Sequence, residues 1–120
     1  MFEIKLEPGK RFLVVKLSGL IRAADYEEQM LEFNKLVAET HPRGLLCDWT
    51  ELKGWDEEGE SIRFIARFEQ RANFERLAVL ADEAWDAEVN RFQEVMNLPT
   101  RRFPPSDRPI ALAWLQTNTQ

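Results

Sequence analysis

The sequence predicts a single-domain α/β sandwich in which a mixed, mostly parallel five-stranded sheet is flanked by four helices. The 120-residue chain is long enough for one domain with its own core and too short for two. Its apolar residues alternate between short runs typical of strands and stripes with helical spacing. The resulting order, ββαβαβαβα without an internal linker or repeat, places parallel strands between helices.

The first two elements are expected to be the strands of one hairpin. Residues 2–6 alternate apolar and charged side chains, the pattern of a half-buried strand. Residues 7–10 have turn composition, and a more buried run follows at 12–17, which Ser18 and Gly19 would close. This pair would form the antiparallel end of the sheet.

The spacing becomes helical over residues 23–40, which are expected to form the first helix. Pro42 and Gly44 would end it. A nearly continuous apolar run at 45–49 then predicts a strand covered on both faces. The apolar stripe of the helix, at i, i+4, i+7 and i+11, consists of Tyr26, Met30, Phe33 and Val37.

The second half of the chain continues this alternation. A second helix is expected at 57–72 and a covered strand at 77–81. Asp82 suits the N-cap of a third helix, because its carboxylate accepts from the free backbone N–H groups there. The apolar stripe of the third helix consists of Trp85, Val89, Phe92 and Met96.

A short last strand and a final helix complete the predicted domain. Residues 101–103 form the strand, and Ser106 would cap a helix that runs through Leu115. We expect the domain to span residues 1–116 and residues 117–120 to form a polar tail.

Composition and charge exclude several classes of function. The net charge is −5 and the isoelectric point is near 5.0, which argues against nucleic acid as a partner, since phosphates need a basic face. No apolar stretch approaches the ~20 residues of a membrane-spanning helix, and the N-terminal residues do not form a signal peptide. The single cysteine rules out an internal disulfide and agrees with a reducing compartment, so a cytoplasmic location is expected.

No set of catalytic or cofactor-binding residues is recognised. The lone His41 and lone Cys47 cannot assemble a zinc-type ligand set, and Cys47 lies inside an apolar strand. No glycine-rich phosphate loop follows a strand, and no serine stands in a nucleophile motif. We therefore expect neither enzymatic activity nor a bound metal or cofactor.

Aromatic residues indicate a candidate binding surface. Trp49 and Trp55 bracket a predicted loop at the carboxyl ends of the strands, where open α/β sheets bind ligands. They are either exposed binding residues or a lid on the core. Phe64 and Phe68 flank the apolar arc of the second helix. A neighbouring helix either covers them, or they line a groove for an apolar ligand, a membrane or a partner chain.

Charged residues accompany these aromatics. Arg63 and Arg67 lie in one row of the second helix, either as a solvated face or as a basic rim suited to a lipid head group or a carboxylate. Asp56, Glu57 and Glu58 stand at the start of that helix, either as a solvated first turn or as a docking edge for a protein partner. The docking alternative includes self-association into a homodimer.

Short stretches along nearly the whole chain match one known family in order and spacing. They are residues 24–27 (Ala-Asp-Tyr-Glu), 45–48 (Leu-Leu-Cys-Asp), 74–82 (Phe-Glu-Arg-Leu-Ala-Val-Leu-Ala-Asp) with Trp85, 102–103 (Arg-Phe) and 111–115 (Ala-Leu-Ala-Trp-Leu). On these stretches the chain resembles the SpoIIAA-like family, also described as STAS/SEC14 or CRAL-TRIO-like, which has the STAS fold of bacterial anti-sigma-factor antagonists. The resemblance implies a cytoplasmic bacterial protein that signals through protein partners or binds a small apolar or lipid-like ligand, including at a membrane surface.

One departure from the family pattern bears on regulation. Anti-sigma-factor antagonists carry a phosphorylatable serine in an Asp-Ser-Ser-Gly-like motif at the start of their second helix. Here the matching residues are Asp56, Glu57, Glu58 and Gly59, so both serine positions hold glutamate. A fixed carboxylate imitates a phosphate only in part, because phosphate carries about −1.5 to −2 charges.

Two hypotheses follow from these observations. The leading one is a non-enzymatic STAS-like binding or regulatory module with an apolar or lipid-like ligand beside the second helix. The alternative is a protein–protein signalling regulator without the phosphorylatable serine.

Overall fold

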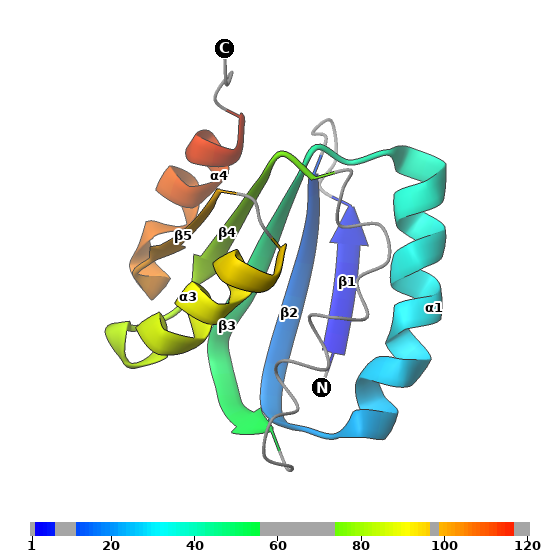
Figure 1. The fold of residues 1–120 in the computed structure, drawn as a ribbon, viewed down its shortest axis with the longest axis horizontal. Helices are drawn as coiled ribbons and strands as arrows, with labels where there is room; N and C mark the ends of the chain where they lie inside the picture. Colours follow the sequence, from blue (N-terminus) through cyan, green and yellow to red (C-terminus); the bar gives the residue numbers. More distant parts are fainter. Residues whose placement is uncertain (1, 7–11, 56–73, 97–98, 117–120) are drawn as a thin grey trace.

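The order of the strands in the sheet equals their order in the chain (Figure 1). The computed structural model describes residues 2–6, 12–55, 74–96 and 99–116. The first two strands pair antiparallel and every later pair is parallel, which confirms the mixed, mostly parallel sheet with a hairpin at one edge. The strands are β1 (Phe2–Leu6), β2 (Phe12–Ile21), β3 (Gly44–Trp55), β4 (Arg76–Leu80) and β5 (Thr100–Phe103).

The described residues form three α-helices rather than the four expected. They are α1 (Ala23–Thr40), α3 (Asp86–Met96) and α4 (Arg108–Gln116), each at a position where the sequence predicts a helix. The helix expected at 57–72 falls within 56–73, outside the described residues. No helix among the described residues is both long and apolar enough to cross a membrane.

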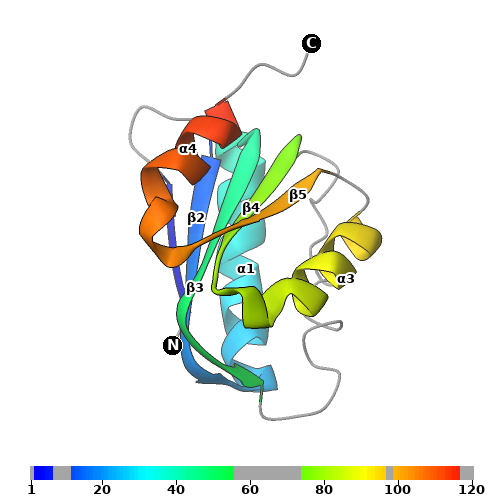
Figure 2. The ribbon, with the colours of Figure 1, turned by 90° about the vertical axis from the view of Figure 1, so that its left-hand side faces the viewer.

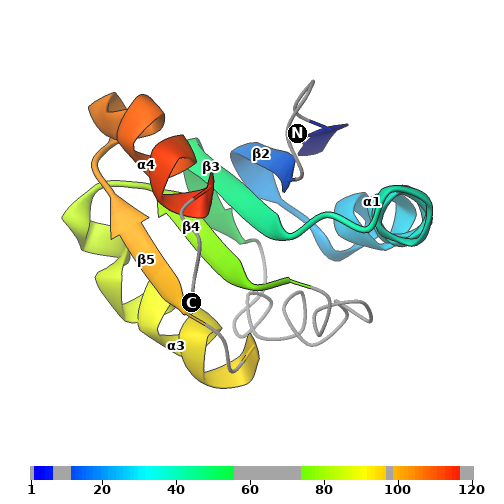
Figure 3. The ribbon, with the colours of Figure 1, turned by 90° about the horizontal axis from the view of Figure 1, so that it is seen from above.

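The helices cover the two faces of the sheet unequally. Helices α1 and α3 lie on one face and α4 on the other (Figures 2 and 3). Parallel strands are joined by right-handed crossovers, and here each crossover advances in the same direction across the sheet. The connecting helices α1 and α3 therefore share a face, whereas α4 follows the last strand and is the one described helix on the opposite face.

Both faces of the central strands are buried, which explains their continuous apolar runs. Each face has its own core cluster, made of alternate residues of β2, β3 and β4. The cluster under α1 and α3 includes Leu13, Val15, Leu17, Phe33, Leu45, Cys47, Trp49 and Val79. The cluster under α4 includes Phe12, Val14, Leu46, Ala78, Phe103 and Leu115.

Two strands are longer than the sequence predicts. Residues 18–21 of β2 pair with 51–55 of β3, so the prediction that Ser18 and Gly19 close the strand is wrong. The register shifts twice along this pairing, and Gly19 (φ 70°) stands at the second shift. Both shifts leave one extra residue in β3, so the bulges belong to β3, and Gly19, which normally indicates a turn, lets β2 continue beside the second one.

The helix starts were predicted with mixed success. The carboxylate of Asp82 accepts a hydrogen bond from the Ala84 backbone N–H at 3.0 Å, which confirms it as an N-cap, although the first turn it begins is a 3-10 helix. The cap predicted at Ser106 is wrong, because Ser106 lies inside a 3-10 turn that precedes α4. That turn begins after Pro104 and has no side-chain cap. Proline at its first position already supplies the helical φ angle.

Candidate functional site

An extension of β2 and β3 forms the carboxyl end of the sheet (Figure 1). Strand β4 ends at Leu80, which pairs with Asp48, while β3 continues to Trp55 and pairs there with Ile21. The prediction of a loop from Trp49 to Trp55 is therefore wrong, since these residues are strand.

Trp49 is part of the core. Its side chain is only 2% exposed and belongs to the cluster under α1 and α3. The indole packs edge-to-face on Trp85, with ring centroids 5.5 Å apart and an interplanar angle of 68°. Of the two alternatives for Trp49, the structure shows the buried one. Trp55 is the last residue of β3, and its place in the strand is set by pairing with Ile21.

The other residues of the predicted binding surface lie outside the described residues. They are Asp56, Glu57 and Glu58 of the acidic edge, and Arg63, Phe64, Arg67 and Phe68 of the expected second helix. Their roles as docking or ligand-binding residues stay predictions.

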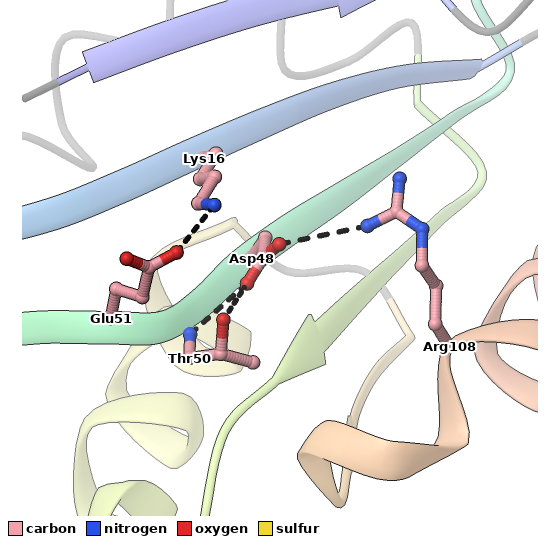
Figure 4. Close-up of polar contacts among 5 residues, drawn as sticks. All are labelled: Lys16, Asp48, Thr50, Glu51 and Arg108. Carbon is pink, nitrogen blue, oxygen red and sulfur yellow. Dashed lines mark hydrogen bonds and ion pairs between the residues drawn. The ribbon is translucent and has the colours of Figure 1, made fainter.

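A charged cluster that the sequence analysis did not single out lies on the α4 face of the sheet (Figure 4). Its centre is the buried carboxylate of Asp48, on β3. One oxygen of Asp48 accepts from the backbone N–H of Thr50 at 3.0 Å and from the Thr50 hydroxyl at 2.7 Å. The other oxygen faces Arg108, the first residue of α4, with 3.6 Å to Nη1.

Lys16 joins the same cluster from β2. Its ammonium is 2.5 Å from a carboxylate oxygen of Glu51. This hydrogen bond and the charge of Glu51 raise the pKa of Lys16, with smaller contributions from Asp48 and Glu3. Lys16 therefore stays protonated across the physiological range.

Lys16, Asp48 and Arg108 of this cluster line a pocket of about 230 Å³. Strand pairing brings them together, because Lys16 lies opposite both Glu3 of β1 and Asp48 of β3, and Lys5 lies opposite Val14. The sequence holds one signal for this pocket: Lys16 and Asp48 each interrupt an apolar run. Which face they share follows only from the register between strands. The pocket lining consists of Glu3, Lys5, Val14, Lys16, Asp48 and Arg108.

The cysteine next to Asp48 is a buried, unreactive thiol. Cys47 is only 2% exposed, and burial raises the pKa of its thiol, with a further contribution from the neighbouring charge of Asp48. A neutral, enclosed thiol is not a nucleophile, which confirms Cys47 as a buried apolar residue. Within the described ranges, no three His, Cys, Asp or Glu side chains are grouped so that they could hold a metal ion.

Comparison with known proteins gives one family match and several similar structures. The model of the SpoIIAA-like family matches residues 12–116. The comparison with curated proteins finds no match. A protein of the DUF3478 family from Shewanella loihica PV-4, with a SpoIIAA-like fold, is 21% identical with a TM-score of 0.75, covering 96% of this chain and 92% of its own.

Two structures of SpoIIAA are also similar. The phosphorylated form of the Bacillus cell fate determinant SpoIIAA is 11% identical with a TM-score of 0.61, and the match covers 93% of this chain and 99% of that one. The unphosphorylated anti-sigma factor antagonist SpoIIAA is 14% identical with a TM-score of 0.63, covering 95% and 98%. At these identities the likeness is one of fold.

Proposed function

The chain belongs to the SpoIIAA-like family, and from this premise we propose that it is a non-enzymatic regulatory module that binds a protein partner at the carboxyl end of its sheet. The SpoIIAA structures that it resembles are of an anti-sigma factor antagonist, a protein named for a protein target. A cytoplasmic location and a basic partner surface are part of this proposal.

The observation that carries the proposal is where β3 ends. Its last residue, Trp55, pairs with Ile21 at the projecting carboxyl end of the middle strand. Open α/β sheets place their binding surfaces at this end. The acidic run Asp56, Glu57 and Glu58 follows Trp55 in the sequence of a chain whose net charge is −5. Complementary charge of this kind speeds encounter and selects a basic partner.

The proposal does not include control by phosphorylation at this place. Both positions that match the serines of the antagonist motif are glutamates, Glu57 and Glu58, which accept no phosphate. If the charge of the docking surface is fixed, the extent of partner binding depends on the concentration of the partner and on ionic strength.

Partner capture with charge-reversal variants tests the proposal. Proteins retained by the immobilised chain are identified and purified, and their affinities are then measured for the wild type and for Asp56→Lys/Glu58→Lys. We expect this double variant to lose the partner. The control is Glu83→Lys/Glu94→Lys, which reverses two exposed acids on and before α3 and should retain it. Equal affinity of the wild type and both variants would contradict the proposal.

A second candidate function is binding of a small apolar or lipid-like ligand beside the expected second helix. It is favoured by Phe64 and Phe68 next to the basic residues Arg63 and Arg67. Burial of Trp49 removes this tryptophan from such a site. Native mass spectrometry of freshly purified protein reports bound lipid and subunit number together. A mass equal to that of the bare chain, in mild conditions, would count against this candidate.

A further inference from the structure

In the part of the chain that the structure describes, one end of the α4 face of the sheet is packed and the other holds a pocket. Helix α4 packs on β3, β4 and β5, with Leu115 and Ala111 in the core beneath it. Toward β1 and β2 the same face holds the pocket of about 230 Å³, and Figure 4 shows three of its lining residues, Lys16, Asp48 and Arg108. Among the described residues, the pocket lies beside the strands that α4 contacts, against β1 and β2.

The pocket gathers three cations in an acidic protein. Lys5, Lys16 and Arg108 line it with two carboxylates, Glu3 and Asp48. The lining carries a formal charge of +1 (three minus two), and Glu51, which pairs with Lys16 from outside the lining, brings the local charge to zero, against −5 for the whole chain. An anion therefore meets no net repulsion at this pocket, and its selection depends on the cations that are not already held by a carboxylate.

The cations differ in how far they are already engaged. Lys16 is held by Glu51 at 2.5 Å. Arg108 Nη1 lies 3.6 Å from Asp48, beyond a normal hydrogen bond, and its side chain is 42% exposed. Lys5 is exposed on β1. A guanidinium presents a planar fork of donors that matches the two oxygens of a carboxylate or phosphate.

We propose that this pocket binds a small oxyanion, a carboxylate or phosphate group, with Arg108 and Lys5 as its ligands. Asp48 competes with the oxyanion for Arg108, because its second oxygen faces the same guanidinium. Its first oxygen is already saturated by the two Thr50 donors, so Asp48 keeps its place when Arg108 turns to a ligand. The pocket lies on the α4 face, and nothing in this proposal depends on the protein partner proposed above.

The test is a titration followed by ¹H–¹⁵N NMR. Inorganic phosphate and acetate are added separately to the full chain at constant ionic strength, with sodium chloride as the balancing salt. We expect saturable shifts at the amides of Lys5, Val14, Lys16 and Asp48. Tighter binding of phosphate or of acetate identifies which oxyanion the pocket prefers.

Four variants test the site, and the expected changes in oxyanion affinity differ in direction. Arg108→Gln should weaken binding about tenfold or more, as loss of a charged hydrogen-bonding group does. Asp48→Asn removes the competing charge, keeps an acceptor for Thr50 and should tighten binding severalfold. Arg91→Gln, at a 53% exposed side chain on α3, is the matched control and should change nothing. Lys5→Gln should weaken binding, and it tests the site on an exposed strand residue if Arg108→Gln disturbs the start of α4.

Three outcomes would overturn the proposal. One is shifts that sodium chloride alone reproduces. Another is equal affinity for Arg108→Gln and Arg91→Gln. The third is weaker binding by Asp48→Asn, because that result makes Asp48 a ligand rather than a competitor.

Discussion

Replacing Trp49 by alanine tests whether this residue is a core residue or a binding residue. With 2% of the side chain exposed, folding removes nearly all of its area, about 200 Å² for a tryptophan, from water. At about 25 cal/mol per Å² that burial contributes roughly 5 kcal/mol, and Trp→Ala substitutions in cores cost ~3–5 kcal/mol. We therefore expect Trp49→Ala to lose about 4 kcal/mol, a large share of the ~5–15 kcal/mol of a typical domain.

Urea denaturation followed by circular dichroism measures this loss. At a slope of about 1.5 kcal/mol per molar urea, the midpoint should fall by about 2.5 M. Leu31→Ala is the control, because that α1 side chain is 77% exposed and its removal should cost less than about 0.5 kcal/mol. A double-mutant cycle of Trp49→Leu with Trp85→Leu should show a coupling of ~0.5–1.5 kcal/mol from the edge-to-face pair. A loss below about 1 kcal/mol in Trp49→Ala with an unchanged slope would refute the core assignment.

Two further predictions concern Cys47 and Gly54. Because burial raises the pKa of the Cys47 thiol, only the unfolded chain ionises there above about pH 8.5, so stability is full below that pH and falls as the pH rises, by up to ~1.4 kcal/mol per unit. The difference in unfolding free energy between wild type and Cys47→Ala should shrink from pH 8 to 10, and a flat difference would contradict this. Gly54 has φ 140° and no atom within 4 Å of an added Cβ, so Gly54→Ala should cost ~1–3 kcal/mol through backbone strain alone. Gly19→Ala, at φ 70°, should lower the free energy of unfolding by less in the same urea assay, about 1 kcal/mol. Equal losses for Gly54→Ala and Gly19→Ala would show that the backbone at the bulge relaxes.

Much of the fold could be predicted because the signals are local. An apolar run such as 45–49 indicates a covered strand whatever its neighbours are, and the helical stripe through Phe33 and Val37 likewise needs no tertiary information. Strand ends were less predictable. Gly19 and Gly54 are of the residue type that usually indicates a turn. Only the pairing between β2 and β3 shows that they lie within strands, next to a bulge.

The site was harder to predict, for a physical reason. The pocket depends on Lys16 lying opposite Asp48 and on Arg108 reaching them from α4, and both conditions depend on register and packing between distant segments. Trp49 shows the same difficulty in another form. A tryptophan after a strand suits either a surface or a core, and its contact with Trp85 decides the matter.

The strand order described above also bears on how the chain assembles. Since β1 to β5 are neighbours in sequence order, each strand that leaves the ribosome meets a sheet edge that is already present. No strand has to be inserted between two others, so each pairing closes one loop of the chain, and the entropy cost of folding is met in small steps. Assembly would then proceed from the hairpin edge toward β5, with α4 sealing the last-formed strands from the opposite side.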